Sequence, residues 1–211
     1  MRAIRLAIKR ALDVAIAGSC LVVLSPLFAA VAVAVTLSMG RPVLFRQTRL
    51  GLEGRPFQLY KFRTMTDERD ETGALLEDEH RITRVGKILR STTLDELPEL
   101  LNVLRGDMSV VGPRPLLPDY DPLYTSDQRR RHGMKPGMAG PVMAMGRNAL
   151  SWDEKFALDV WYVDHWTLRL DLKILTMSAW KLLKREGISA TGHATMPRFE
   201  GSGSSKEDPN G

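Results

Sequence analysis

The chain has 211 residues, a length that suits one domain of ordinary size. Its formal net charge of +5 and isoelectric point of about 9.5 suit anionic phosphates, acidic lipid headgroups and nucleic acid about equally. The single cysteine, Cys20, excludes an intramolecular disulfide and a zinc site built from several cysteines. A mean hydropathy of −0.17 is typical of a soluble protein, but the apolar residues are unevenly distributed.

The apolar residues concentrate in residues 14–39, where no side chain is charged. As one straight helix this segment would be about 39 Å long, more than the roughly 30 Å hydrocarbon core of a bilayer. The segment is also longer than the apolar region of a cleaved signal peptide. It therefore predicts a membrane-inserted helix.

Basic residues flank this segment on both sides. They are Arg2, Arg5, Lys9 and Arg10 before it and Arg41, Arg46 and Arg49 after it. Because basic flanks favour the cytoplasmic side, both ends prefer the same face of the membrane. A bend at Ser25-Pro26 would allow this, since proline removes a main-chain hydrogen bond and a serine hydroxyl can satisfy the freed carbonyl. The pattern favours a re-entrant helix over a kinked helix that crosses the membrane.

The segment that follows predicts a small, mainly helical α+β domain. Residues 42–65 contain two strand-like stretches separated by a turn at residues 51–54, which predicts a short β-hairpin. Residues 67–78 are acidic and typical of a loop. Residues 81–90 predict an amphipathic helix, either an ordinary surface helix or one whose basic face meets anionic headgroups or substrate phosphates.

Further helices are expected towards the C-terminus. Residues 94–104 predict a second helix, followed by a short strand and a proline-rich loop, and residues 121–150 should be mostly loop. Residues 152–185 predict a long helical segment that is broken near residues 165–170. Its tryptophans suit either a membrane interface or core packing. They are Trp152, Trp161, Trp166 and Trp180.

Two adjacent carboxylates, Asp95 and Glu96, lie at the start of the helix expected from residue 94. A structural role accounts for them well. Thr93 and Glu96 match a capping box, acids favour the first turn of a helix, and Pro98 fits the same turn. The N-terminus of a helix is also a place where anions bind, which leaves a functional role open.

Six basic residues near this pair in the sequence could hold phosphate. They are Lys61, Arg63, Lys87, Arg90, Arg105 and Arg114. Arg114 lies between two prolines that restrict the direction of its guanidinium, and arginine binds phosphate through two parallel charge-assisted bonds. Two carboxylates among so many cations, next to a membrane helix, indicate phosphoryl transfer with a divalent metal.

These motifs resemble those of one protein family. The sequence LDELPELLNVLRGDMSVVGPRP at residues 94–115, preceded by YKFRTM and followed by RHGMKPGMAG and GRNALSW, is similar to the bacterial sugar transferase family, the monotopic phosphoglycosyl transferases. The resemblance covers nearly the whole chain, including the Ser25-Pro26 helix. The chain also resembles the small Campylobacter-type members that start glycan assembly for N-linked glycoproteins. Larger members add several transmembrane helices or a soluble domain, which are not expected in this chain.

The resemblance implies a role for individual residues. Asp95 would be the nucleophile that attacks the sugar-linked phosphorus of a UDP-sugar and releases UMP, and a polyprenyl phosphate would then attack the phosphosugar ester. Nearby cations and the start of a helix should keep Asp95 ionised at neutral pH. Glu96 would help to position Mg²⁺, so both carboxylates are the expected metal ligands. The residues implied around the substrate are Lys61, Arg90 and Arg114 at the phosphates and, less strongly, Arg147 at the nucleotide.

The resemblance also implies a setting and partners. It implies a re-entrant helix in residues 1–40 and a catalytic domain in residues 41–200, at the cytoplasmic face of the bacterial inner membrane with both termini cytoplasmic. Residues 201–211 lack apolar anchors and should be a disordered tail. The expected partners are a UDP-sugar, undecaprenyl phosphate, membrane phospholipid and later glycosyltransferases of the same pathway. UDP-N,N′-diacetylbacillosamine is the leading donor, with UDP-GlcNAc and UDP-GalNAc as alternatives.

Other functions fit parts of the sequence. A membrane-bound, metal-dependent phosphatase or pyrophosphatase would release phosphate without a lipid acceptor. A non-catalytic membrane scaffold would tolerate replacement of Asp95. A nucleic-acid binder is disfavoured, because the aromatic residues cluster in the C-terminal helices and do not interleave with the basic stretches.

Overall fold

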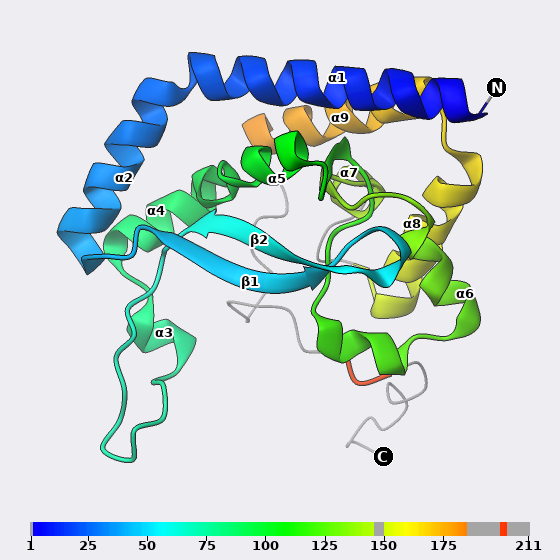
Figure 1. The fold of residues 1–211 in the computed structure, drawn as a ribbon. Helices are drawn as coiled ribbons and strands as arrows, with labels where there is room; N and C mark the ends of the chain where they lie inside the picture. Colours follow the sequence, from blue (N-terminus) through cyan, green and yellow to red (C-terminus); the bar gives the residue numbers. More distant parts are fainter. Residues whose placement is uncertain (1, 146–149, 185–198, 202–211) are drawn as a thin grey trace.

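The computed structural model describes residues 2–145, 150–184 and 199–201 (Figure 1). This part of the chain is mainly helical and contains two small two-stranded sheets, so the predicted α+β class is confirmed. Arg147 and residues 202–211 of the expected tail lie outside the described residues.

The N-terminal helix is broken where the sequence predicted. Helices α1 (Arg2–Val23) and α2 (Ser25–Met39) are bent by 64° relative to each other. The Ser25 hydroxyl donates a 2.8 Å hydrogen bond to the carbonyl of Val22. That carbonyl lies four residues before Pro26, which has no amide hydrogen to give it. The serine therefore satisfies the main chain at the bend, as expected.

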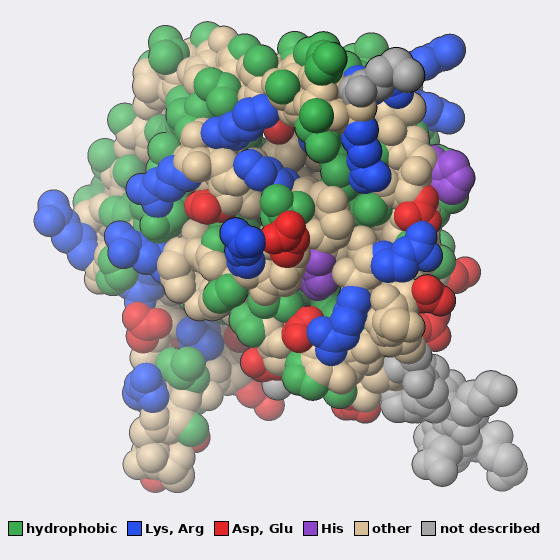
Figure 2. Space-filling model, turned by 45° about the vertical axis from the view of Figure 1, so that its right-hand side comes forward, with side chains coloured by type: hydrophobic (Ala, Val, Ile, Leu, Met, Phe, Trp, Pro, Cys, Tyr) green, Lys and Arg blue, Asp and Glu red, His purple; other side chains and the backbone are tan. Residues whose placement is uncertain are grey.

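The bent pair of α1 and α2 presents an apolar surface. No single helix in the described ranges is long and apolar enough to cross a bilayer, but the two together meet that criterion. The side chains of Val23 and Leu37 are 74% and 83% exposed. Hydrophobic side chains gather along the top and upper left of Figure 2, the region that α1 and α2 occupy in Figure 1.

Two of the basic residues before the apolar segment make intramolecular contacts. The buried Nζ of Lys9 lies 2.7 Å from Oδ2 of Asp171 and donates a 2.9 Å hydrogen bond to the carbonyl of Val111. Arg10 donates to two carbonyls in the last turn of helix α5 (Glu99–Arg105). Lys9 and Arg10 therefore make contacts within the fold, whereas Arg2 and Arg5 are exposed among the described residues of this flank.

A third charged residue of α1 attaches the helix to a strand. Strand β3 (Ser109–Val111) pairs in parallel with β4 (Gly137–Ala139). The buried carboxylate of Asp13 accepts hydrogen bonds from the Ser109 hydroxyl and the Val110 amide, at 3.0 and 2.9 Å. Together with Lys9 it satisfies main-chain groups of β3 that a neighbouring strand would otherwise bind. Helix α1 is thus fixed to the strand that leads to Arg114.

The predicted β-hairpin is present. Strands β1 (Leu44–Leu50) and β2 (Pro56–Phe62) pair antiparallel, and the short 3₁₀ turn η1 (Leu52–Gly54) joins them. The buried amide side chain of Asn102 accepts a hydrogen bond from the Tyr60 amide and donates one to the Gln58 carbonyl. This side chain attaches α5 to the hairpin and so places the two elements that build the site side by side.

The next helices follow the acidic segment, which forms a protruding loop as expected (Figure 1). Helix α3 (Asp78–Arg81) is a single turn. Helix α4 (Arg84–Thr92) matches the predicted amphipathic helix. Its N-cap residue is Thr83, whose hydroxyl accepts a hydrogen bond from the Gly86 amide.

The C-terminal half contains short elements where loop was expected. The 3₁₀ turns η3 (Pro118–Leu123) and η4 (Arg130–Gly133) and helices α6 (Ser126–Arg129) and α7 (Pro141–Met145) all lie in this region. The long helical segment is broken as predicted. Its parts are α8 (Trp152–His165) and α9 (Leu168–Lys184).

The four tryptophans divide between the two roles expected for them. Trp152 packs in an aromatic cluster with Tyr120, Phe156 and Phe199. Trp166 is buried and donates to Asp171, the partner of Lys9. Trp161 and Trp180 are 40% and 60% exposed, so these two are the candidates for a membrane interface. They are the only tryptophans in the described ranges with that much exposed surface.

Candidate active site

The two adjacent carboxylates lie on a short turn between two helices. Residues Leu94–Glu96 form the 3₁₀ turn η2, and α5 begins only at Glu99, so the prediction of one helix from residue 94 is wrong. Thr93 has a left-handed backbone (φ 56°), which ends α4 and separates it from η2. The break within residues 94–104 follows from Pro98, which has no amide hydrogen to bond to the Leu94 carbonyl. That carbonyl instead accepts a 3.3 Å bond from the Leu97 amide, which closes the tighter turn.

The expected capping box is also absent from this turn. The Thr93 hydroxyl donates to the Thr92 carbonyl and makes no bond to the Glu96 amide, which reaches the Thr93 carbonyl instead. Because the Glu96 side chain does not cap the turn, it is available to the basic residues opposite it. The capping-box explanation therefore does not apply to Glu96.

Glu96 is held by two of the predicted phosphate-binding residues. Its Oε1 lies 2.6 Å from Nζ of Lys61, on β2, and 2.8 Å from Nη2 of Arg114, in the loop after β3. Burial of the side chain opposes ionisation, but Arg114 and Lys61 outweigh it and lower the pKa of Glu96 to about 2. Glu96 is a fixed anion that joins two separate elements of the fold.

Asp95 differs from its neighbour. Within the described ranges no cationic group lies within 4 Å of its carboxylate. Its pKa is raised above the usual value by burial and then by the charge of Glu96, while Lys61 and Arg90 act more weakly in the opposite direction. The nearby cations led us to expect a lowered pKa for Asp95. The pKa is raised instead, because the closest of these cations bind Glu96. Asp95 is therefore the unpaired and more basic carboxylate of the two.

A third carboxylate, which sequence reasoning missed, lies at the start of α5. Glu99 is only 4% exposed, and its Oε1 is 3.2 Å from Nζ of Lys61. Burial and the charge of Glu96 raise the pKa of Glu99 to about 7, against the opposing effect of Lys61 and Arg114. The ammonium of Lys61 is thus shared between Glu96 and Glu99. The spacing of three residues between the two acids was the available signal, since it places them on one side of a helical turn.

Arg90 reaches the site because α4 approaches the hairpin closely. A side chain at Gly86 would collide with the main chain of Thr64, since its Cβ would lie 1.9 Å from that carbonyl oxygen. The absence of a side chain lets Arg90, one turn later, donate a 3.2 Å hydrogen bond to the Thr64 hydroxyl. Arg90 acts on Asp95 through its charge and not through direct contact.

The loop that carries Arg114 is held by its main chain. The Gly112 amide donates to Ala139 and the Gly137 amide to Pro113, at 2.9 and 3.0 Å. The two chain segments touch so closely that a Cβ on Gly137 would lie 2.0 Å from the Gly112 nitrogen. The main chain that carries Arg114 therefore cannot shift without breaking the β3–β4 pair.

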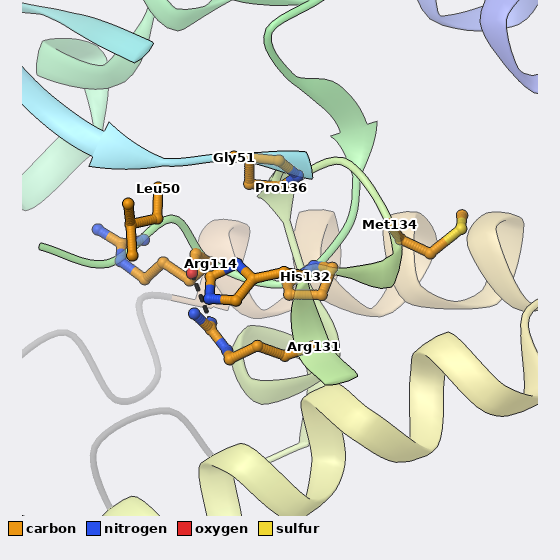
Figure 3. Close-up of a pocket in the computed structure, with 8 residues that line it drawn as sticks. Leu50, Gly51, Arg114, Arg131, His132, Met134 and Pro136 are labelled. Carbon is orange, nitrogen blue, oxygen red and sulfur yellow. Dashed lines mark hydrogen bonds between the residues drawn. The ribbon is translucent and has the colours of Figure 1, made fainter. Parts of the chain in front are cut away.

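A buried ion pair supports the same loop from behind. Nη2 of Arg131 donates a 2.7 Å hydrogen bond to the Arg114 carbonyl, drawn as a dashed line in Figure 3, and lies 2.6 Å from Oδ2 of Asp159 on α8. The two charged side chains are 2% and 3% exposed. Sequence reasoning missed both residues. Arg131 begins the motif RHGMKPGMAG, but Asp159 lies 28 positions away and nothing in the sequence links the two.

A narrow hollow lies beside this ion pair (Figure 3). Its lining includes Arg114, Arg131 and His132 but neither Asp95 nor Glu96. Burial and the charge of Arg131 lower the pKa of His132 to about 4, so this imidazole is neutral at physiological pH. The hollow thus adjoins the loop and is not the carboxylate centre itself.

Only some of the predicted phosphate-binding residues lie near Asp95 and Glu96. Lys61 and Arg114 bind Glu96 directly, and Arg90 lies close enough to act on Asp95. Arg63 instead pairs with Asp67 outside the centre. Arg105 donates to the Tyr60 hydroxyl, and Lys87 is exposed on α4.

The carboxylates suit a magnesium ion only in combination with substrate. In the described ranges no three carboxylate, histidine or cysteine groups are placed to hold a metal ion. Asp95 is unpaired, and both ion pairs of Glu96 use one oxygen, Oε1. Magnesium is often held by one or two carboxylates plus phosphate and water oxygens, and the residues present fit that arrangement.

Comparison with known proteins shows what this chain is similar to. A family model described as bacterial sugar transferase matches residues 4–185. The uncharacterized sugar transferase EpsL of Bacillus subtilis (strain 168) is 60% identical over 169 residues, 80% of this chain and 84% of that protein. A UDP-glucose:undecaprenyl-phosphate glucose-1-phosphate transferase of Caulobacter vibrioides is 40% identical over 185 residues, 83% of this chain and 69% of that protein.

A longer relative matches as well. The enzyme of the same name from Klebsiella pneumoniae is 36% identical over 191 residues, which are 86% of this chain but 41% of that protein. The residues matched by the family model include the hairpin with Lys61, the pair Asp95 and Glu96, and the loop with Arg114. The chain belongs to the bacterial sugar transferase family.

Proposed function

We propose that this enzyme transfers a sugar-1-phosphate from a UDP-sugar to undecaprenyl phosphate and releases UMP. One observation carries the proposal, the unequal surroundings of two adjacent carboxylates. Glu96 is bound by Lys61 and Arg114, whereas Asp95 is left unpaired and more basic. This difference suits a division of roles between an anchoring carboxylate and a nucleophilic one. The Caulobacter and Klebsiella relatives are named as UDP-glucose:undecaprenyl-phosphate glucose-1-phosphate transferases, which supports the reaction class.

The reaction proceeds in two displacements at one phosphorus atom. The carboxylate of Asp95 attacks the sugar-linked phosphorus, the bridging P–O bond of the diphosphate breaks, and UMP leaves with the bridging oxygen. An oxygen of undecaprenyl phosphate then attacks the same phosphorus, and the acyl phosphate bond breaks. Asp95 is released as a carboxylate, and the product is a sugar linked to undecaprenyl diphosphate. Lys61, Arg90 and Arg114 would offset the negative charge of the reacting phosphates.

A magnesium ion held by Asp95 and Glu96 together with the diphosphate would supply further charge neutralisation at the leaving group. The residues of the chain would then orient the donor. Arg114 presents a planar guanidinium from a fixed loop, and Lys61 presents a point charge from β2. Removal of divalent ions with a chelator, followed by titration with Mg²⁺, tests this part of the proposal.

The membrane helix would bring both substrates to one side of the bilayer. The bend at Ser25-Pro26, the apolar surface of α1 and α2, and exposed Trp161 and Trp180 support a re-entrant helix with the catalytic domain at the interface. We place the site at the cytoplasmic face of the inner membrane with both termini cytoplasmic. A soluble nucleotide sugar and a lipid phosphate can both reach such a site.

The donor sugar is tested with a panel. The resemblance to small family members favours UDP-N,N′-diacetylbacillosamine, whereas the Caulobacter and Klebsiella relatives are named for UDP-glucose. The panel contains these two, UDP-GlcNAc, UDP-GalNAc and UDP-galactose, each with and without undecaprenyl phosphate. We expect one donor to give steady UMP release and labelled lipid only when the acceptor is present. Steady release of sugar phosphate or orthophosphate without acceptor would indicate a phosphatase or pyrophosphatase instead.

A further inference from the structure

The buried carboxylate of Glu99 has no part in the mechanism described so far. It begins α5, where an acid is ordinarily explained by its favourable interaction with the helix dipole. That interaction contributes only weakly at an exposed site, whereas Glu99 is 4% exposed. Burial of a carboxylate is unfavourable unless a partner compensates for the lost hydration. The partner identified for it is Lys61, at 3.2 Å.

The charged groups around Glu99 form an alternating chain. Arg114 binds Glu96, Glu96 binds Lys61, and Lys61 binds Glu99. Arg49 adds a further positive charge that interacts with both Glu96 and Glu99. In this chain Glu96 has two cationic partners at less than 3 Å. Glu99 lies at the end of the chain and has one.

Lys61 needs a second acceptor to have a defined position. A lysine ammonium is a point charge on a flexible stem and can rotate about a single acceptor. Two acceptors at 2.6 and 3.2 Å restrict it to one place between the turn η2 and the first residue of α5. We propose that Glu99 is a positioning residue that holds the Lys61 ammonium against Glu96 for the reacting phosphates. This inference rests on the proposed function in one respect, that Lys61 binds the donor diphosphate.

The inference predicts a graded response to substitution. Glu99→Gln keeps an oxygen acceptor of the same length but replaces an ion pair with a weaker bond from the ammonium to a neutral oxygen, so kcat/KM should fall about threefold. Glu99→Leu keeps the volume and removes the acceptor, so kcat/KM should fall about thirtyfold, mostly through a higher KM for the UDP-sugar. Glu71→Leu, in the exposed acidic loop, is the control for loss of a negative charge.

A double-mutant cycle separates positioning from general destabilisation. If Glu99 acts through Lys61, Glu99→Leu should cause little further loss in a Lys61→Met background. If Glu99 only stabilises the fold, its effect should be the same with or without Lys61, and thermal stability should fall in parallel. A loss of thirtyfold in both backgrounds overturns the inference, as does a Glu99→Gln variant that is as impaired as Glu99→Leu.

A second measurement does not depend on enzymatic activity. The rate at which an amine-acylating reagent modifies Lys61, followed by peptide mass spectrometry, reports how firmly its amine is held. The modification rate of Lys61 should rise several-fold in Glu99→Leu and change little in Glu99→Gln or Glu71→Leu. An unchanged rate in Glu99→Leu would contradict the positioning role. This result decides the inference even if the donor panel shows phosphatase activity, which would overturn only the proposed function.

Discussion

The main-chain carbonyl of Arg114 accepts a 2.7 Å hydrogen bond from Nη2 of Arg131. Arg131 is itself held by Asp159, so a buried ion pair supports the loop that carries Arg114. The side chain of Arg114 can therefore bind Glu96 from a main chain that is restrained by β4, by η4 and by α8.

Arg131→Lys tests this support. Lysine keeps the positive charge beside Asp159, but a single ammonium cannot reproduce the planar set of donors that binds Asp159 and the Arg114 carbonyl together. We expect kcat/KM to fall about tenfold, equivalent to roughly 1.4 kcal/mol, because Arg114 is less well oriented. Steady-state kinetics with the preferred UDP-sugar measure the effect. Unchanged kinetics would show that the loop keeps its position without this hydrogen bond.

Arg114→Lys should reduce activity more than a charge-conserving exchange normally does. The planar guanidinium reaches Glu96 from a loop whose main chain cannot follow a shorter or differently shaped side chain. We expect kcat/KM to fall by about tenfold or more, with little change in thermal stability, because the side chain is more than half exposed. Near-normal kinetics would assign Arg114 a purely structural role.

Several features of this protein could be predicted from local sequence. The hairpin turn, the Ser25-Pro26 bend and the break between α8 and α9 each depend on residues that are close neighbours in the chain. The turn at Asp95 and Glu96 shows the limit of such patterns. The match of Thr93 and Glu96 to a capping box predicted a continuous helix, but Pro98 cannot donate to the Leu94 carbonyl, which closes a 3₁₀ turn with the Leu97 amide.

Long-range partners could not be predicted in this way. Lys9 looked like a membrane flank because its partner, Asp171, lies 162 residues away. The role of Asp13 depends on a strand edge that exists only in the folded chain. Glu99 looked like an ordinary acid in the first turn of a helix, because its burial is produced by the hairpin that packs against it.

His132 should make the protein less stable in mild acid. Its pKa is about 4 when folded and about 6.5 when unfolded, so below pH 6.5 the unfolded chain binds a proton that the folded chain does not. The contribution of His132 to stability is therefore lost as the pH falls from 6.5 towards 4, by about 2 kcal/mol at pH 5. Glu99 acts in the opposite direction, because burial and the charge of Glu96 raise its pKa to about 7 in the folded chain.

Thermal unfolding in detergent between pH 5 and pH 8 measures this dependence. We expect His132→Gln to gain stability relative to the unsubstituted protein as the pH falls from 8 to 5, whereas the control His165→Gln, at an exposed position, should keep the original slope. Identical slopes in all three proteins would mean that His132 does not titrate differently on folding.

The bend at Ser25-Pro26 should determine the topology. With both residues replaced by alanine, α1 and α2 can form one continuous helix with an apolar segment of about 39 Å, long enough to cross the bilayer. A cysteine at position 3, in a chain with Cys20→Ala, reports the side on which the N-terminus lies. It should resist impermeant thiol reagents in intact cells when Ser25 and Pro26 are present, and become partly accessible in the double variant, with loss of activity.

Labelling of position 3 in the protein with the native bend tests the re-entrant helix. Labelling of position 3 from outside the cell, without any replacement at Ser25 or Pro26, would contradict a re-entrant helix. The attachment of Lys9 and Asp13 to β3 adds a reason for the expected loss of activity, because a reoriented α1 would pull on the strand that leads to Arg114.

If Asp95 is the nucleophile, the mass of the intact protein should change when the donor is present without acceptor. Incubation with the preferred UDP-sugar and Mg²⁺, without lipid acceptor, should add the mass of one sugar phosphate and release at most one equivalent of UMP. Peptide mass spectrometry should place the adduct on Asp95, and undecaprenyl phosphate should remove it. Asp95→Asn is nearly isosteric but a poor nucleophile, so it should show no adduct and no turnover while remaining folded. The absence of any adduct, together with substantial turnover by Asp95→Asn, would contradict the account.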